Sequence, residues 1–177
     1  MKLFGGAVEA IVPENMYDAS KFRDVPDHQE MFVGEIQGYT SGFIVELCEE
    51  TLPDQPVELA LHEHVDDIHA ANGTPPEDVD TVETIHSEKD EKLVVGLHQM
   101  VRDPKKGIVI ICFALLRLPK YKSDVMFTST VEVPNDEGIT ATTVATLVNY
   151  TKTSVKSGLA SFNLLDPALF AESAHEE

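Results

Sequence analysis

The chain has 177 residues, 42% of them hydrophobic, a composition that excludes a disordered chain and suits one domain with a sizeable core. Its 13 Lys and Arg stand against 31 Asp and Glu, and the formal net charge of -18 disfavours nucleic acid and anionic membranes as partners. A basic protein surface is the natural partner of such a chain, although the same charge is also compatible with a role in solubility alone.

No targeting or membrane segment is expected. The N-terminal apolar run is short and interrupted by Glu9, unlike a signal peptide, and the longest apolar run ends at Arg117, short of a membrane span. Cys48 and Cys112 each lie in an apolar run, which indicates small core residues and not a disulfide framework. These features predict a reducing compartment, the cytosol or the nucleus.

The first notable segment is an acidic turn, which we call the acidic corner and define as Arg23–Glu30. Before it, Ala7–Val12 is expected to form a short strand, and Asp18 or Ser20 to cap one helical turn. Within it, Pro26 fixes its own φ and favours an extended Val25, so no helix crosses the corner. A strand from about His28 to Val33 follows. The corner therefore presents its carboxylates on a stiff turn, for binding or simply as a solvated loop.

The segment from Gly42 to Thr51 is ambiguous but favours a helix capped by Ser41. Phe43, Ile44, Leu47 and Cys48 share one arc of a helical wheel. The other arc would present a second acidic patch to solvent, made of Glu46, Glu49 and Glu50. An ordinary solvated face is the simpler interpretation of that patch.

A second helix is predicted over Val57–Ala71, because its apolar residues follow helical spacing and Asn72-Gly73 provides a stop. His62, Asp66 and His69 share one flank of this helix, and such a set is compatible with a divalent metal. No fourth ligand or HExxH spacing accompanies them, so a polar helix flank without metal is favoured. His64, nearer the apolar stripe, is expected to be a packed, hydrogen-bonded histidine.

Four strands and a last helix complete the expected fold. The strands cover about 81–87, 92–101, 107–118 and 123–133, and the links between them are too short for crossover helices, so neighbours should be antiparallel. Ile108–Leu116 is apolar at nearly every position and predicts a central strand covered on both faces. The helix is predicted over Thr140–Ser157 with Gly158 as its stop, then a closing strand over Leu159–Leu165.

The sequence thus predicts an α+β fold, an antiparallel sheet of about six strands with helices on both faces. Residues 1–170 are expected to form one domain and residues 171–177 a disordered tail. No phosphate-binding loop and no nucleophile elbow is present, and no cofactor is predicted. Ser, His and Asp occur throughout, so composition leaves a catalytic triad open, but nothing in the sequence positions one.

Three groups of motifs, in order along nearly the whole chain, resemble the Ran guanine-nucleotide release factors, Mog-type proteins that bind the GTPase Ran. The motifs are Leu3–Ala7, Ile11–Pro13, Asp18–Ser20, Arg23, Val25–Asp27 and Gln29–Glu30, then Ala114–Tyr121 with Ser123–Val125, and finally Asp166–Phe170. The resemblance implies an α/β/α sandwich of the PsbP type.

The resemblance also implies a function. The chain would bind Ran and promote release of its guanine nucleotide, without covalent chemistry, as a monomer in nucleus and cytoplasm. Asp27 and Glu30 would form the core of the binding surface, with both side chains exposed enough to replace without loss of folding. The flanking contacts would be Arg23, Asp24 and Gln29. Apart from the resemblance, we expect the acidic patch Glu46, Glu49 and Glu50 to support this surface, because the chain is strongly negative. The alternatives are a metal-dependent hydrolase using His62, Asp66 and His69, and a PsbP-like luminal subunit, which the cysteine usage and the missing transit peptide disfavour.

Overall fold

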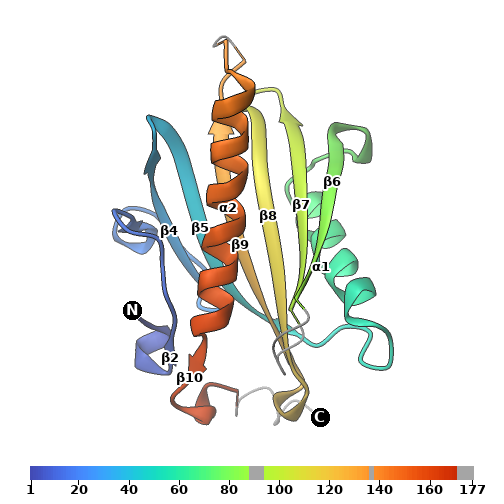
Figure 1. The fold of residues 1–177 in the computed structure, drawn as a ribbon. Helices are drawn as coiled ribbons and strands as arrows, with labels where there is room; N and C mark the ends of the chain where they lie inside the picture. Colours follow the sequence, from blue (N-terminus) through green and yellow to red (C-terminus); the bar gives the residue numbers. More distant parts are fainter. Residues whose placement is uncertain (88–93, 136–137, 171–177) are drawn as a thin grey trace.

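A seven-stranded antiparallel sheet organises the structure, a computed structural model that describes residues 1–87, 94–135 and 138–170 (Figure 1). Its strand order is β3-β4-β5-β9-β8-β7-β6. The strands are β3 (Tyr17–Asp18), β4 (Gln29–Ile36), β5 (Tyr39–Glu49), β6 (Val79–Ser87), β7 (Val94–Asp103), β8 (Gly107–Leu118) and β9 (Ser123–Val133). The antiparallel arrangement and the four consecutive strands from β6 to β9 confirm the prediction, although Lys92 and Leu93 lie outside the described residues.

β8 is interior, as its apolar sequence predicted. It pairs with β7 on one side and β9 on the other, and β9 is the middle strand of the sheet. Ile110 and Phe113 are each 1% exposed and lie on opposite faces of β8. Burial of both faces explains why this strand has so few polar residues.

The helix predicted over Gly42–Thr51 is wrong, because this segment is most of β5. The backbone pairs with β4 on one side and with β9 on the other, from Ser41 to Glu49. Phe43 and Val45 are fully buried on one face, a period of two that the helical wheel did not accommodate because it left Val45 outside the apolar arc. Gln37 and Gly38, both at positive φ, make the two-residue turn between β4 and β5.

Two helices cover the two faces of the sheet (Figure 1). α1 (Val57–Ala71) packs on β7 and β8, and α2 (Ala141–Ser161) crosses the other face over β8 and β9. The helix bounds of α1 agree with the prediction. Helices on both faces of one sheet confirm the predicted layer arrangement.

α2 continues past Gly158, which was expected to end it. A Cβ added at Gly158 would lie 3.0 Å from Cζ of Phe43 and 3.1 Å from Cδ1 of Phe127. The glycine therefore lets the helix approach two buried aromatic rings and has no capping role. Consequently the closing strand is shorter than predicted, and only β10 (Asn163–Leu164) is extended.

A small three-stranded sheet joins the N-terminal segment to the segment that follows α2, visible at the lower left of Figure 1. β2 (Val8–Glu9) pairs with both β1 (Lys2–Leu3) and β10, so the strand predicted over Ala7–Val12 is real but shorter. Short 3₁₀ turns connect the elements: η1 (Phe4–Gly6), η2 (Ala19–Lys21), η3 (Pro76–Asp78), η4 (Pro119–Tyr121) and η5 (Pro167–Phe170). The predicted tail, 171–177, lies outside the described residues. In the described part of the chain, no helix is long and apolar enough to cross a membrane.

Candidate functional site

The acidic corner borders a pocket of about 350 Å³. Its lining residues come from η1, the β3–η2 segment, the corner, β4 and η5: Phe4, Gly5, Asp18, Ser20, Val25, Pro26, Asp27, Gln29, Glu30, Met31 and Leu169. Asp18 caps η2 as predicted, and its carboxylate accepts hydrogen bonds from the Ser20 N–H at 2.9 Å and the Ser20 hydroxyl at 2.7 Å. These bonds lower the pKa of Asp18. The pocket is therefore acidic at neutral pH.

Asp27 and Glu30 differ in their surroundings. Asp27 is exposed at the pocket rim, as the stiff turn predicted. Glu30 is half-buried, and its Oε1 accepts a hydrogen bond of 2.7 Å from the backbone N–H of Phe4. Glu30 lies opposite Val45, on the face of β4 that packs into the core. Glu30 is therefore less exposed than expected, because its carboxylate ties the N-terminal segment to the sheet.

The flanking residues of the corner are only partly as expected. Arg23 and Asp24 are exposed, and the Arg23 guanidinium contacts the Met31 sulfur at 2.8 Å. Gln29 is half-buried at the start of β4. His28, whose role the sequence left open, lies with its Nε2 3.5 Å from Oε1 of Glu46.

The second acidic patch does not exist as one surface. Because β5 is a strand, alternate residues point to opposite faces, so Glu46 and Glu49 lie on different faces of the sheet. Glu46 stays beside the corner, since it is the register partner of Gln29. Glu50 is 14% exposed, with Oε1 4.0 Å from Nε of Arg117. Only Glu46 can therefore extend the corner.

Segments far apart in sequence meet at this end of the molecule. Leu165 and Asp166 donate backbone hydrogen bonds to the carbonyl of Ala7, at 2.8 and 3.1 Å. The Tyr121 and Phe170 rings stack at 5.1 Å between centroids. The first and third groups of sequence motifs therefore both line this pocket, through Leu169 in the third group, and the second group contacts the third through the Tyr121–Phe170 stack.

Sequence reasoning missed a buried ion-pair network behind this region. Asp124 is fully buried and accepts hydrogen bonds from Nε of Arg117 at 2.9 Å and from the backbone of Thr51 at 3.3 Å, and its Oδ2 lies 2.7 Å from Nε2 of His64. Burial alone would raise the pKa of Asp124, but its bonds to His64 and Arg117 lower it. Arg117 also donates to the carbonyls of Thr51 and Leu52. The available signal was a pair of opposite charges at the ends of two neighbouring apolar strands: Arg117 near the end of β8 and Asp124 at the start of β9.

The three residues considered as metal ligands do not come together. His69 is buried, with Nε2 2.7 Å from Oε1 of Gln99 and its ring edge-on to Phe113. His62 and Asp66 are exposed on α1. One of the three side chains is thus in the core and the other two are in solvent, so they do not form the shared metal site that the hydrolase alternative requires. His64 is packed and hydrogen-bonded, as predicted.

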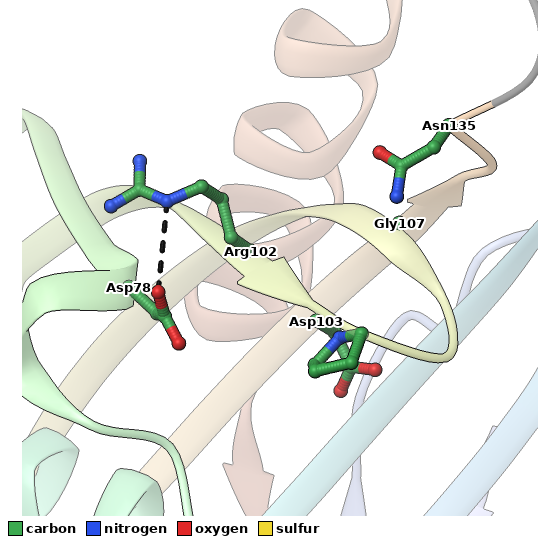
Figure 2. Close-up of a pocket in the computed structure, with 6 residues that line it drawn as sticks. Asp78, Arg102, Asp103, Gly107 and Asn135 are labelled. Atoms are coloured by element: carbon green, nitrogen blue, oxygen red, sulfur yellow. Dashed lines mark ion pairs between the residues drawn. The ribbon is translucent and has the colours of Figure 1, made fainter.

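A second pocket, of about 230 Å³, lies at the opposite end of the strands, where β7 turns into β8 (Figure 2). It is lined by Asp78, Arg102, Asp103, Pro104, Gly107 and Asn135. Arg102 reaches toward Asp78, 3.7 Å away, and pairs with Asp80 at 2.7 Å. Because internal carboxylates already neutralise its guanidinium, this pocket is a weaker candidate than the corner.

Comparison with known proteins decides the family. The model of the "Ran-interacting Mog1 protein" family matches residues 1–133, three quarters of the chain. The chain belongs to the Ran-interacting Mog1 protein family. The match includes the acidic corner, the pocket residues up to Met31 and the ion-pair network.

Individual relatives and a solved structure match this chain over nearly its whole length. The Ran guanine nucleotide release factor of Bos taurus is 29% identical over 95% of this chain and 94% of its own length. The nuclear import protein MOG1 of Saccharomyces cerevisiae is 27% identical over 97% of this chain and 84% of its own. The structure of the Saccharomyces cerevisiae Ran-binding protein Mog1p superposes with a TM-score of 0.76 at 25% identity, covering 96% of each chain. The α+β fold is thus the fold of Mog1.

Proposed function

We propose that this protein binds the small GTPase Ran through the acidic corner and promotes release of its guanine nucleotide, in nucleocytoplasmic transport. The main support is that the first and third groups of sequence motifs line one acidic pocket in a chain of the Mog1 family. The net charge of -18 favours a partner with basic groups. This role places the protein in the nucleus and cytoplasm.

The corner suits competition for a nucleotide site. A GTPase holds its nucleotide through a phosphate-binding loop, a lysine and a magnesium ion. A rigid exposed carboxylate, such as Asp27 beside Pro26, can attract those positive groups or draw a switch segment away from the magnesium. Binding that disfavours nucleotide is an allosteric coupling, so at equilibrium nucleotide disfavours the partner equally. No covalent bond is made or broken.

The contacts in this proposal are Asp27 first, then Asp24, Arg23 and Gln29, with Glu46 extending the surface along β5. Glu30 contributes chiefly by holding Phe4 at the pocket wall. Glu49 and Glu50 are not part of this surface. Glu49 lies on the opposite face of the sheet from Glu46, and Glu50 lies beside Arg117.

The test follows release of a fluorescent guanine nucleotide from purified Ran. Wild-type protein should accelerate release, and Asp27→Asn should slow the accelerated rate by about tenfold, the size expected for loss of a central interface charge. Asp67→Asn is the matched control, because it removes the same charge from an exposed site on α1. If neither the wild type nor the control accelerates nucleotide release, the proposed function is wrong. Equal rates for wild type and Asp27→Asn would move the site away from the corner.

A further inference from the structure

Half of one sheet face carries apolar side chains that neither α1 nor α2 covers. We call it the open face and define it as Tyr17, Met31, Val33 and Ile44. Tyr17 lies opposite Val33, and Met31 lies opposite Ile44. Because residues two apart on a strand share a face, these four side chains form one continuous patch across β3, β4 and β5.

The patch is on the α1 side of the sheet but away from α1. Along β5, Ile44 alternates with the buried Phe43 and Val45, which face α2. The core cluster under α1 instead includes Leu97, Phe113 and Met126, from β7, β8 and β9. Figure 1 shows α1 behind β6 and β7, at the far side of the sheet from β4. Neither α1 nor α2 therefore packs on the open face, and the Arg23 guanidinium contacts it only at the Met31 sulfur.

Its exposure is unusual for apolar side chains on a sheet. Tyr17 is 72% exposed on the edge strand β3, and Met31, Val33 and Ile44 are all half-buried. A connected apolar patch of this kind on a soluble protein marks an interaction site more often than scattered single residues do. Tyrosine and methionine are also enriched in interface cores, and exposed aromatic anchors supply much of the binding energy.

Acidic residues border the open face and indicate the charge of the partner that it would bind. Glu35 follows Val33 on the same face and is exposed, and the half-buried Glu46 follows Ile44 on that face. Gln29 and Met31 also line the corner pocket, so the open face continues directly into the acidic corner. An apolar centre with an acidic rim fits a protein surface that presents apolar side chains flanked by Lys and Arg. A second copy of this chain would bring like charges together.

We propose that the open face is the hydrophobic half of the partner-binding surface, with Tyr17 as its anchor. The inference rests on the proposed function, which supplies Ran as the partner. The acidic corner then steers the encounter and sets its salt dependence, and the open face holds the complex together after docking.

The test compares affinity for purified Ran between variants. Tyr17→Ala should weaken binding by about tenfold or more, mainly through faster dissociation, as expected for an aromatic anchor. Val33→Thr is a second variant that keeps shape and strand preference while adding a hydroxyl, and it should weaken binding by about fivefold. The control is Leu59→Ala, which truncates a 49% exposed apolar side chain on α1 and should change affinity by less than about twofold. Circular dichroism checks the folding of each variant.

Salt separates this role from that of the corner. Between low and high ionic strength, the loss of affinity caused by Tyr17→Ala should stay constant, whereas the loss caused by Asp27→Asn should shrink as charges are screened. If wild type and both open-face variants bind Ran equally well, the inference fails while the proposed function stands. Failure of wild type to bind Ran overturns both. Self-association of the protein alone that Tyr17→Ala abolishes would assign the face to a second copy and also overturn the inference.

Discussion

Nε of Arg117 lies 2.9 Å from Oδ1 of Asp124, across neighbouring strands, with the two side chains 7% and 0% exposed. The pair also anchors the segment after β5, because Arg117 donates to the carbonyls of Thr51 and Leu52. His64 of α1 completes the network through Asp124. One buried carboxylate thus joins the sheet, the loop before α1 and α1 itself.

Asp124→Asn should strongly destabilise the fold. Loss of the Asp124 charge leaves the buried Arg117 with only the more distant carboxylate of Glu50, 4.0 Å away, and breaking such a buried pair costs about 3–5 kcal/mol in the free energy of unfolding. Glu132→Gln is the control, because it breaks only the partly exposed pair with Lys106, 3.3 Å away, and should cost less than about 1 kcal/mol. Urea unfolding measures both. Similar midpoints for the two variants would contradict a stabilising role for the network.

The same carboxylate predicts acid sensitivity. The pKa of Asp124 is lowered in the folded state by His64 and Arg117 against the effect of burial, so its contribution to stability is fully present above about pH 4. That contribution is lost as the pH falls through the lowered folded-state pKa. The unfolding midpoint of wild type should therefore decline below about pH 4 more steeply than that of Asp124→Asn.

His98 should add a second pH dependence, at milder acidity. Its ring is fully buried, and within the described residues neither ring nitrogen has a hydrogen-bond partner. Burial and the nearby Lys152 of α2 lower its pKa, although Glu83 of β6 opposes this, and Cys112 is its uncharged neighbour on β8.

Above about pH 6.5 neither state of His98 binds a proton, so the residue has no effect on the pH dependence. Below that pH the unfolded chain takes up a proton that the folded chain resists, and the free energy of unfolding falls until the folded-state pKa is reached. His98→Leu should flatten the Tm profile between about pH 7 and pH 5. His62→Gln, at an exposed histidine of α1, is the control and should keep the wild-type slope.

Gly158→Ala should destabilise the protein even though alanine is the better helix former. Helix propensity gains about 1 kcal/mol, but the new methyl group meets the buried rings of Phe43 and Phe127, and overpacking costs about 1–3 kcal/mol. A net loss of about 1 kcal/mol is expected. Thr153→Ala, exposed on the same helix, should be neutral or stabilising. A rise in Tm for Gly158→Ala would show that the rings can move aside.

Glu30→Ala and Asp27→Ala should separate structure from recognition. Without the Glu30 carboxylate, the backbone N–H of Phe4 loses its 2.7 Å acceptor, at a cost of about 1–3 kcal/mol, and hydrogen exchange of that amide should speed up. Glu30→Gln keeps an acceptor oxygen and should preserve most of the protection. Asp27→Ala changes an exposed side chain and should alter stability by less than about 0.5 kcal/mol. Equal protection of Phe4 in all three variants would contradict the assigned tie.

The sequence by itself determined the elements whose pattern is local. The apolar run of β8, the short links between β6 and β9 and the helical spacing of α1 required no knowledge of distant partners. The stiff turn at Pro26 and the cap at Asp18 were likewise readable, because capping and proline geometry depend only on adjacent residues.

Tertiary structure decided the rest, where a residue's partner lies far along the chain. β5 is a strand because β4 and β9 supply hydrogen-bonding partners on both sides. Gly158 lies inside α2, where the absence of a side chain leaves room for the rings of Phe43 and Phe127. Glu30 became a structural tie only when Phe4 was folded back onto it. The open face could not be foreseen either, since helical periodicity shows which side chains of a helix are buried but not which half of a sheet that helix covers.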